Sequence, residues 1–260
     1  MKKRLALIVA AAAALLTAVP ASAVQFGTPD GDDHPQVGIM VAKINGVPAW
    51  RCSGAIISPT VFLTAGHCVS GATSAEVWFD SGAPRPTVPA GYPFTGEYSG
   101  TPIAHPRYSG FSEFPATFDI GVVILDNPHP GPYASLADEG AIDALRKGPA
   151  RKDAFDLVGY GLQDSIPPIF QQDIQRYFGT ASLVNTHNQL TAGYSVQLTA
   201  APGTGGSLCF GDSGGPVFLA GTTTIVAVNS FVLNLQCMGA GFSYRTDTAD
   251  SLAFVGQFLP

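Results

Sequence analysis

The feature that most restricts the fold is a succession of short segments rich in Val, Ile, Phe and Thr, separated by turn-forming residues. The 260 residues include 30 glycines and 21 prolines, which mark the chain as rich in turns. This spacing favours an all-β sandwich or barrel over alternating strand–helix units. The expected strands are 37–44, 55–57, 61–63, 76–79, 120–125, 154–158, 194–199, 216–219, 223–229 and 241–244.

Helical character is limited to 136–145 and to a C-terminal stretch after Thr246, whose apolar residues could share one face. Residues 80–118 and 162–207 read as rich in loops. The hydrophobic fraction of 46% excludes a disordered chain.

The first 23 residues have the three parts of a secretory signal peptide. A basic start at 2–4 is followed by an apolar run at 5–19 and by Ala-Ser-Ala at 21–23. The run is short for a membrane span, and a retained anchor is the alternative reading. We therefore expect a secreted, extracellular protein of residues 24–260 that has no membrane association once the signal is removed.

Loss of this segment would leave an acidic protein. Lys plus Arg would fall from 13 to 10 against 19 Asp plus Glu, a net charge of −9. An acidic balance argues against nucleic acid or an anionic membrane as the main partner.

The sequence GDSGGP at 211–216 surrounds the most informative residue, Ser213. A serine hydroxyl is a weak nucleophile unless a base removes its proton. The glycine two residues earlier allows the N–H groups of Gly211 and Ser213 to face one point, as an oxyanion hole requires.

Partners for this serine stand in two apolar contexts. His67 follows the strand-like run 61–63, and Asp119 precedes the apolar segment 120–125. A buried carboxylate needs a hydrogen-bonding partner, which a histidine N–H would supply. The order His, Asp, Ser is that of chymotrypsin and differs from the order in subtilisin and the α/β-hydrolases.

Two other classes of protein were weighed. An esterase or lipase would use Gly-x-Ser-x-Gly, which 211–215 satisfies formally, but the β-rich context and the order of the three residues argue against it. A binding module that has lost catalysis is disfavoured because all three positions are intact. Other polar residues read as surface or turn positions rather than catalytic or calcium-binding ones: His34, His105, His129, His187, Asp30, Asp32 and Asp33.

Together these motifs resemble the secreted serine proteases of the trypsin/chymotrypsin family. The resemblance extends over 64–68, 119–125, 158–161 and 209–216, although Tyr160 stands where the family usually has a tryptophan. It implies two antiparallel β-barrels with the active site in the cleft between them, followed by the short C-terminal helix. The first barrel would span about 24–147 and the second about 148–260, with the polar stretch 146–149 as linker.

The resemblance also implies the role of each residue. Ser213 attacks the scissile carbonyl, His67 carries the proton, Asp119 orients the histidine, and the N–H groups of Gly211 and Ser213 hold the oxyanion. Ser230 would hydrogen-bond Asp119 and begin the strand along which substrate lies. We expect a monomeric serine endopeptidase that acts on protein or peptide substrates without cofactor or metal.

Four cysteines behind a signal peptide predict two disulfides with three possible pairings. Closure of short loops favours Cys52–Cys68 and Cys209–Cys237, and the resemblance implies the same pairs. Metal ligation is the alternative, but no CxxC or paired Cys/His spacing supports it.

The specificity pocket and the activation step are further implications of the resemblance. A neutral Ser207 at the pocket base would leave a bound Lys or Arg unpaired, which is costly. We therefore expect cleavage after small to medium aliphatic residues. In the activation step, the ammonium group of Val24, exposed by signal cleavage, would pair with Asp212. The remaining expected substrate-binding residues are Leu208, Ser230, Val232 and Gly241.

Overall fold

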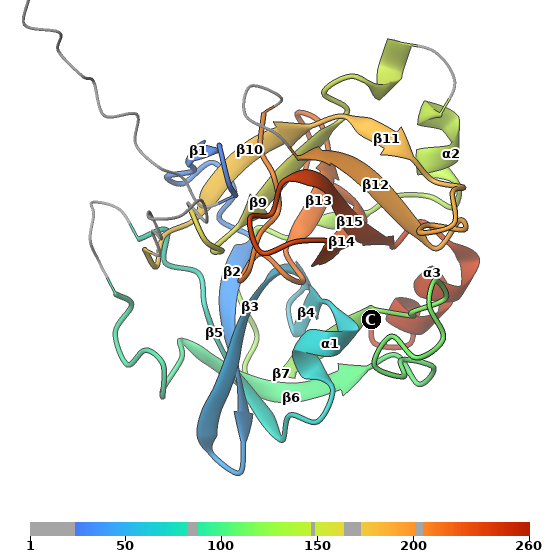
Figure 1. Cartoon of the computed structure of the whole chain (residues 1–260). Helices are drawn as coiled ribbons and strands as arrows, with labels where there is room; N and C mark the ends of the chain where they lie inside the picture. The colour runs from blue at the N-terminus through green and yellow to red at the C-terminus, as the bar shows by residue number, and fades with distance from the viewer. Residues whose placement is uncertain (1–23, 83–87, 147–148, 164–172, 201–204) are drawn as a thin grey trace, which may run out of the picture.

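The computed structural model describes residues 24–82, 88–146, 149–163, 173–200 and 205–260, so the expected signal segment lies outside the described residues. Figure 1 shows two β-rich units, with strands β2 to β7 in blue to green below and strands β9 to β15 in yellow to red above, where the blue strand β1 lies beside β10. The expected all-β fold with a short C-terminal helix is confirmed. Within the described ranges, no helix has both the length and the apolar character needed to span a bilayer.

The first unit is a closed antiparallel barrel of six strands, joined in the order β2-β3-β4-β7-β6-β5. Four of these strands, β2, β4, β5 and β7, are buried along most of their length, whereas β6 and the first part of β3 are largely exposed or half-buried. The strands are β2 (Val37–Ile44), β3 (Val47–Ser58), β4 (Val61–Thr64), β5 (Ser74–Trp78), β6 (Tyr98–Ala104) and β7 (Gly121–Leu125).

The second unit is a curled sheet in the order β1-β10-β9-β13-β14-β15-β12-β11, with β8 pairing in parallel with β14. All other pairs in this sheet are antiparallel. The strands are β1 (Thr28–Pro29), β8 (Ser135–Leu136), β9 (Phe155–Gly159), β10 (Tyr177–Ala181), β11 (Leu183–Asn185), β12 (Ser195–Ala200), β13 (Pro216–Leu219), β14 (Thr224–Val232) and β15 (Gly239–Arg245).

Three short helices and one 3-10 turn complete the described elements. They are α1 (Gly66–Val69), α2 (Ala141–Leu145), η1 (Pro149–Arg151) and α3 (Ala249–Gly256). Thr248 caps α3 by accepting a hydrogen bond from the N–H of Ser251. The apolar face of α3 buries Phe254 and Val255.

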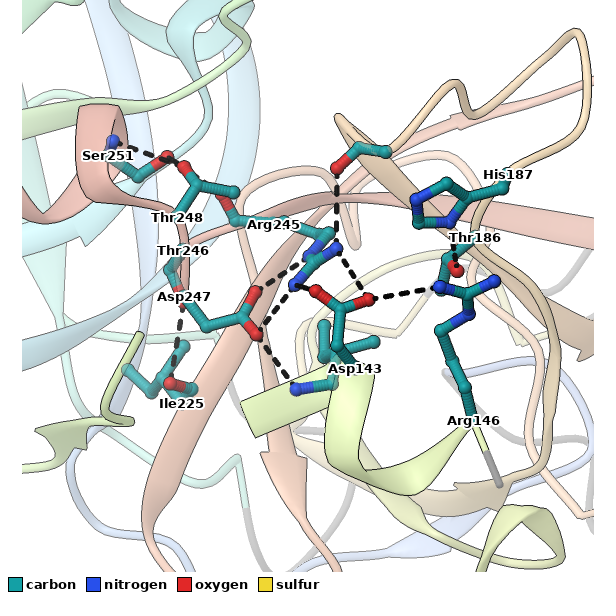
Figure 2. A network of polar contacts seen from close by, with 12 residues as sticks. Asp143, Arg146, Thr186, His187, Ile225, Arg245, Thr246, Asp247, Thr248 and Ser251 are labelled. Atoms are coloured by element: carbon teal, nitrogen blue, oxygen red, sulfur yellow. Dashed lines mark hydrogen bonds and ion pairs between the residues drawn. The ribbon is translucent and has the colours of Figure 1, made fainter. Parts of the chain in front are cut away.

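A polar network joins α2 to the start of α3 (Figure 2). The Arg245 guanidinium donates to Asp247 and to Asp143, and Asp247 also accepts the N–H of Ile142. The side chains of Arg245 and Asp247 are almost fully buried, so each charge is compensated within the protein. This network fixes α2 against the second sheet.

The two units share one hydrophobic core, which contains Ile39 and Leu63 from the barrel and Val158, Phe218 and Val228 from the sheet. Both β1 and β8 pair with strands of the second sheet, although they lie before the expected boundary near residue 147. The linker candidate 146–149 lies partly outside the described residues. That boundary stays a prediction.

Candidate active site

His67 lies in α1, a single helical turn that follows β4 directly. The next residue, Cys68, forms a disulfide with Cys52 of β3, and the carbonyl of Cys68 accepts a hydrogen bond from the Trp50 indole at 2.8 Å. The short turn is thus fastened to β3 by a covalent bond and a hydrogen bond. The expected second disulfide, Cys209–Cys237, is also confirmed.

Asp119 is fully buried just before β7, and its carboxylate faces the histidine ring. His67 Nδ1 lies 2.9 Å from Oδ2 and 3.1 Å from Oδ1, and the His67 N–H donates to Oδ1 at 2.7 Å. Ser230 Oγ donates to Oδ2 at 2.5 Å. The structure therefore brings together His67, Asp119 and Ser230.

The environment of His67 sets its proton affinity. Burial lowers the pKa of the imidazole, but the charge of Asp119 and its hydrogen bond raise it, and the net pKa lies above the ordinary 6.5. The carboxylate thus favours the protonated imidazolium, the form that a base takes after accepting a proton.

Phe118, immediately before Asp119, has a left-handed backbone with φ of 49°. Bulky residues rarely adopt this conformation, which persists only where surrounding contacts hold it. The Phe118 ring stacks on His105 and lies 3.7 Å from the Arg107 guanidinium carbon. His105 and Arg107 both contact Asp250 of α3. These contacts link the C-terminal helix to the residue beside Asp119.

Ser213 follows a tight loop shaped by Gly211, whose φ is 97°. The carbonyl of Phe210 accepts the N–H of Leu162 at 2.8 Å, which turns the N–H of Gly211 the opposite way. The carbonyl of Gly211 accepts Ser53 Oγ at 2.9 Å. Among the described contacts, neither N–H of Gly211 or Ser213 donates to another residue, so both are available to an oxyanion.

The close approach of the two units requires glycine after Ser213. At Gly214, with φ of 77°, a Cβ would lie 2.0 Å from Thr64 Oγ1. The Ser53 N–H also donates to the carbonyl of Ser213 at 2.8 Å. Strand β3 of the barrel therefore positions the loop that carries Ser213.

Asp212 and Val24 are both fully buried, and the Val24 N–H donates to the Asp212 carboxylate. Burial raises the pKa of Asp212 to about 7, although the N–H groups of Cys209, Gly161 and Val24 and the charge of Arg51 lower it. The structure thus brings this expected pair together in the interior.

His67 and Ser213 line one cavity of about 250 Å³. Its other lining residues are Leu208, Cys209, Phe210, Ser230, Phe231 and Val232. Ser207 and Gly241 are not among them. Ser207 is buried and donates to the carbonyl of Cys237 at 2.9 Å, and a Cβ at Gly241 would lie 2.7 Å from Leu208 Cδ2. The Leu208 side chain therefore occupies the space beside Gly241, which was expected to contact substrate.

Several residues that the sequence placed on the surface are buried instead. Asp30 is 4% exposed and is bonded to Arg176 and His34, because the turn that carries it folds onto the second sheet. His105 and His129 are also buried, against aromatic rings. Each of these polar groups lies among partners that compensate for its burial.

One group of metal-type side chains occurs among the described residues, Cys52, His67 and Cys68. Both cysteines are oxidised to a disulfide and cannot supply thiolate ligands. Sequence reasoning missed Phe118, Arg107 and Arg51 as neighbours of the site. Two of them could have been found from the sequence, because Phe118 directly precedes Asp119 and Arg51 directly precedes Cys52.

Comparisons with known proteins show the family and the fold of this chain. The family model described as Trypsin matches residues 28–250. A collagenase of Hypoderma lineatum is 27% identical over 215 residues, covering 76% of this chain and 74% of the relative. A trypsin of Simulium vittatum is 28% identical over 183 residues, covering 66% and 67%. The solved structure of HL collagenase superposes with a TM-score of 0.69 at 17% identity, covering 90% of this chain and 97% of the other.

Proposed function

Because the chain belongs to the trypsin family of serine peptidases, which hydrolyse peptide bonds through a catalytic triad, we propose that His67, Asp119 and Ser213 form that triad. The observation that carries the proposal is the Asp119 carboxylate, which is fully buried and bonded to both nitrogens that His67 presents to it. His67 in turn shares one cavity with Ser213.

In the first step His67 removes the proton of Ser213 Oγ as that oxygen attacks the scissile carbonyl. Asp119 stabilises the resulting imidazolium and holds the tautomer that leaves Nε2 free to accept the proton. The N–H groups of Gly211 and Ser213 bind the oxyanion. The imidazolium then protonates the leaving amine, and water hydrolyses the acyl-enzyme by the same route.

Apolar side chains of small to medium size are the proposed residues before the scissile bond. The cavity beside Ser213 has Leu208, Phe231 and Val232 in its lining, and no carboxylate is present among the described lining residues. A Lys or Arg side chain bound there would have no partner for its charge. The Leu208 side chain lies against Gly241 and makes the pocket shallow. We infer a shallow apolar pocket suited to Ala, Val or Leu.

A panel of p-nitroanilides ending in Ala, Val, Leu, Phe and Arg tests this preference. One or two methylenes in such a pocket are worth only about 1–3 kcal/mol, so we expect cleavage of more than one of the aliphatic substrates. A tenfold advantage for the Arg substrate would contradict the pocket.

Export is proposed to complete the enzyme. Cleavage after Ala23 would release the protein to the outside and create an ammonium group at Val24, whose nitrogen already lies at Asp212. The pair would order the loop of Gly211, because an unpaired buried carboxylate is costly. We propose a secreted monomer that acts on protein or peptide substrates, and N-terminal sequencing of the secreted protein would show whether it begins at Val24.

A further inference from the structure

Arg51 contacts the oxyanion loop at Gly211 and does not line the apolar cavity. A Cβ at Gly211 would lie 3.1 Å from Arg51 Nη2 and 3.5 Å from Arg51 Nε. The guanidinium edge therefore packs against the backbone whose N–H faces the reacting carbonyl. Its charge also lowers the pKa of Asp212, so it acts electrostatically within this loop.

Arg51 belongs to β3, the barrel strand that contacts the loop of Ser213. The cavity for the residue before the scissile bond is built by Leu208, Phe231 and Val232 of the second sheet. Strand β3 of the barrel approaches Ser213 from the other unit, where the Ser53 N–H binds the Ser213 carbonyl. A peptide that crosses Ser213 from the second sheet must continue over β3.

Arg51 also forms one wall of a hollow on the barrel, with a volume of about 180 Å³. The hollow shares no lining residue with the apolar cavity and is lined by Val41, Pro48, Ala49, Trp50, Arg51, Tyr92 and Pro93. Arg51 is the charged residue of this lining and is half-buried. A side chain that enters from the leaving peptide would meet the guanidinium first.

We propose that Arg51 selects substrates with an acidic side chain at the first or second residue after the scissile bond. This inference rests on the proposed function of the same site. A guanidinium binds a carboxylate with paired, charge-assisted hydrogen bonds and repels an ammonium group. The enzyme would thus recognise an apolar residue before the bond and an acidic residue after it.

The test uses a set of quenched fluorescent peptides that all have Leu before the scissile bond. The members differ only in having Glu, Gln or Lys at the first or at the second position after the bond. Wild-type kcat/KM should follow the order Glu, Gln, Lys, with about a tenfold difference between Glu and Lys, as for a half-buried ion pair. Arg51→Glu should reverse the order, Arg51→Gln should flatten it, and Arg51→Lys should retain it.

Comparing ratios within each variant removes any change in stability or in absolute turnover. Lys152→Glu, an exposed charge reversal in the second unit, is the matched control and should keep the wild-type order. Equal wild-type rates on the three peptides, or an unchanged order in Arg51→Glu, would overturn this site alone. If the wild type cleaves neither the peptides nor the p-nitroanilides, the proposed function itself fails.

Discussion

Replacing Val24 by glycine should strongly weaken the proposed activation pair while leaving Asp212 and the triad unchanged. Val24 is fully buried in the core of the second unit, and its Cγ1 lies 2.6 Å from where a Cβ would stand at Gly206. Complete burial of a valine side chain is worth about 1.5–3 kcal/mol. Glycine also has more backbone freedom to lose when the N-terminus becomes ordered, which costs roughly another 0.5–1 kcal/mol.

The combined loss is about 2–4 kcal/mol, so the equilibrium constant for insertion of the N-terminus should fall roughly 30- to 900-fold. Active-site titration with a serine-directed reagent would measure the competent fraction. Val24→Ile, which keeps an apolar side chain of similar shape, is the matched control and should retain most of the activity. N-terminal sequencing must show that each variant begins at residue 24.

The pH dependence gives a second readout of the same pair. An α-amino group ordinarily titrates near pH 7.7–8.0, and pairing with Asp212 should raise its pKa in the folded protein. The pair needs both a protonated amino group and an ionised Asp212, so its stabilisation is lost as pH rises through the raised pKa of the amino group. Full activity of Val24→Gly, or of a form with extra residues before Val24, would refute the reasoning.

Three further perturbations test other parts of the structure. Burial lowers the pKa of His67 and Asp119 raises it, so Asp119→Asn should move the acidic limb of the kcat/KM profile to lower pH. The same variant should lower kcat by about 10⁴-fold, as the equivalent substitution does in the chymotrypsin family. An unmoved limb would show that Asp119 does not set this pKa. Arg176→Met should cost about 3–5 kcal/mol in chemical denaturation because the buried Asp30 loses its guanidinium partner and keeps only His34. The double variant with Asp30→Leu should recover part of this loss, and equal losses would refute the pairing. Replacing Cys209 and Cys237 by serine should cost about 3 kcal/mol by opening a 28-residue loop, measured as a lower Tm, and an unchanged Tm would contradict the role of the bridge.

The strands that sequence predicted best are those composed mostly of apolar residues. Residues 37–44 and 216–219 form β2 and β13 with the expected bounds. In contrast, β6 and β10 lie in the ranges 80–118 and 162–207, which read as loops. Strand β6 contains Gly100 and Pro102, and the glycine is required because a Cβ would lie 2.6 Å from the carbonyl of Ile124. Pairing with a neighbouring strand here overrides weak local propensity.

The expected helix at 136–145 was too long, since only Ala141–Leu145 is helical. Leu136 pairs with Ile225 in the sheet, and Gly140 adopts a left-handed conformation before the helix begins. The sequence pattern could not show a strand partner nearly ninety residues away.

The residues expected at the site differ in how far sequence could place them. His67, Asp119 and Ser230 were expected together from motifs, and hydrogen bonds now join them. The pocket residues depend on how one side chain packs, and the position of Leu208 against Gly241 could not be read from the chain. Arg51 was hidden for the same reason, because its neighbour Gly211 lies 160 positions later in the sequence.

The most direct test of the account is to treat the mature protein with phenylmethylsulfonyl fluoride and locate the modified residue by peptide mass spectrometry. We predict one sulfonyl group on Ser213, loss of peptidase activity in parallel with labelling, and neither labelling nor activity in Ser213→Ala. Full peptide hydrolysis by Ser213→Ala, or labelling at another serine with loss of activity, would contradict it.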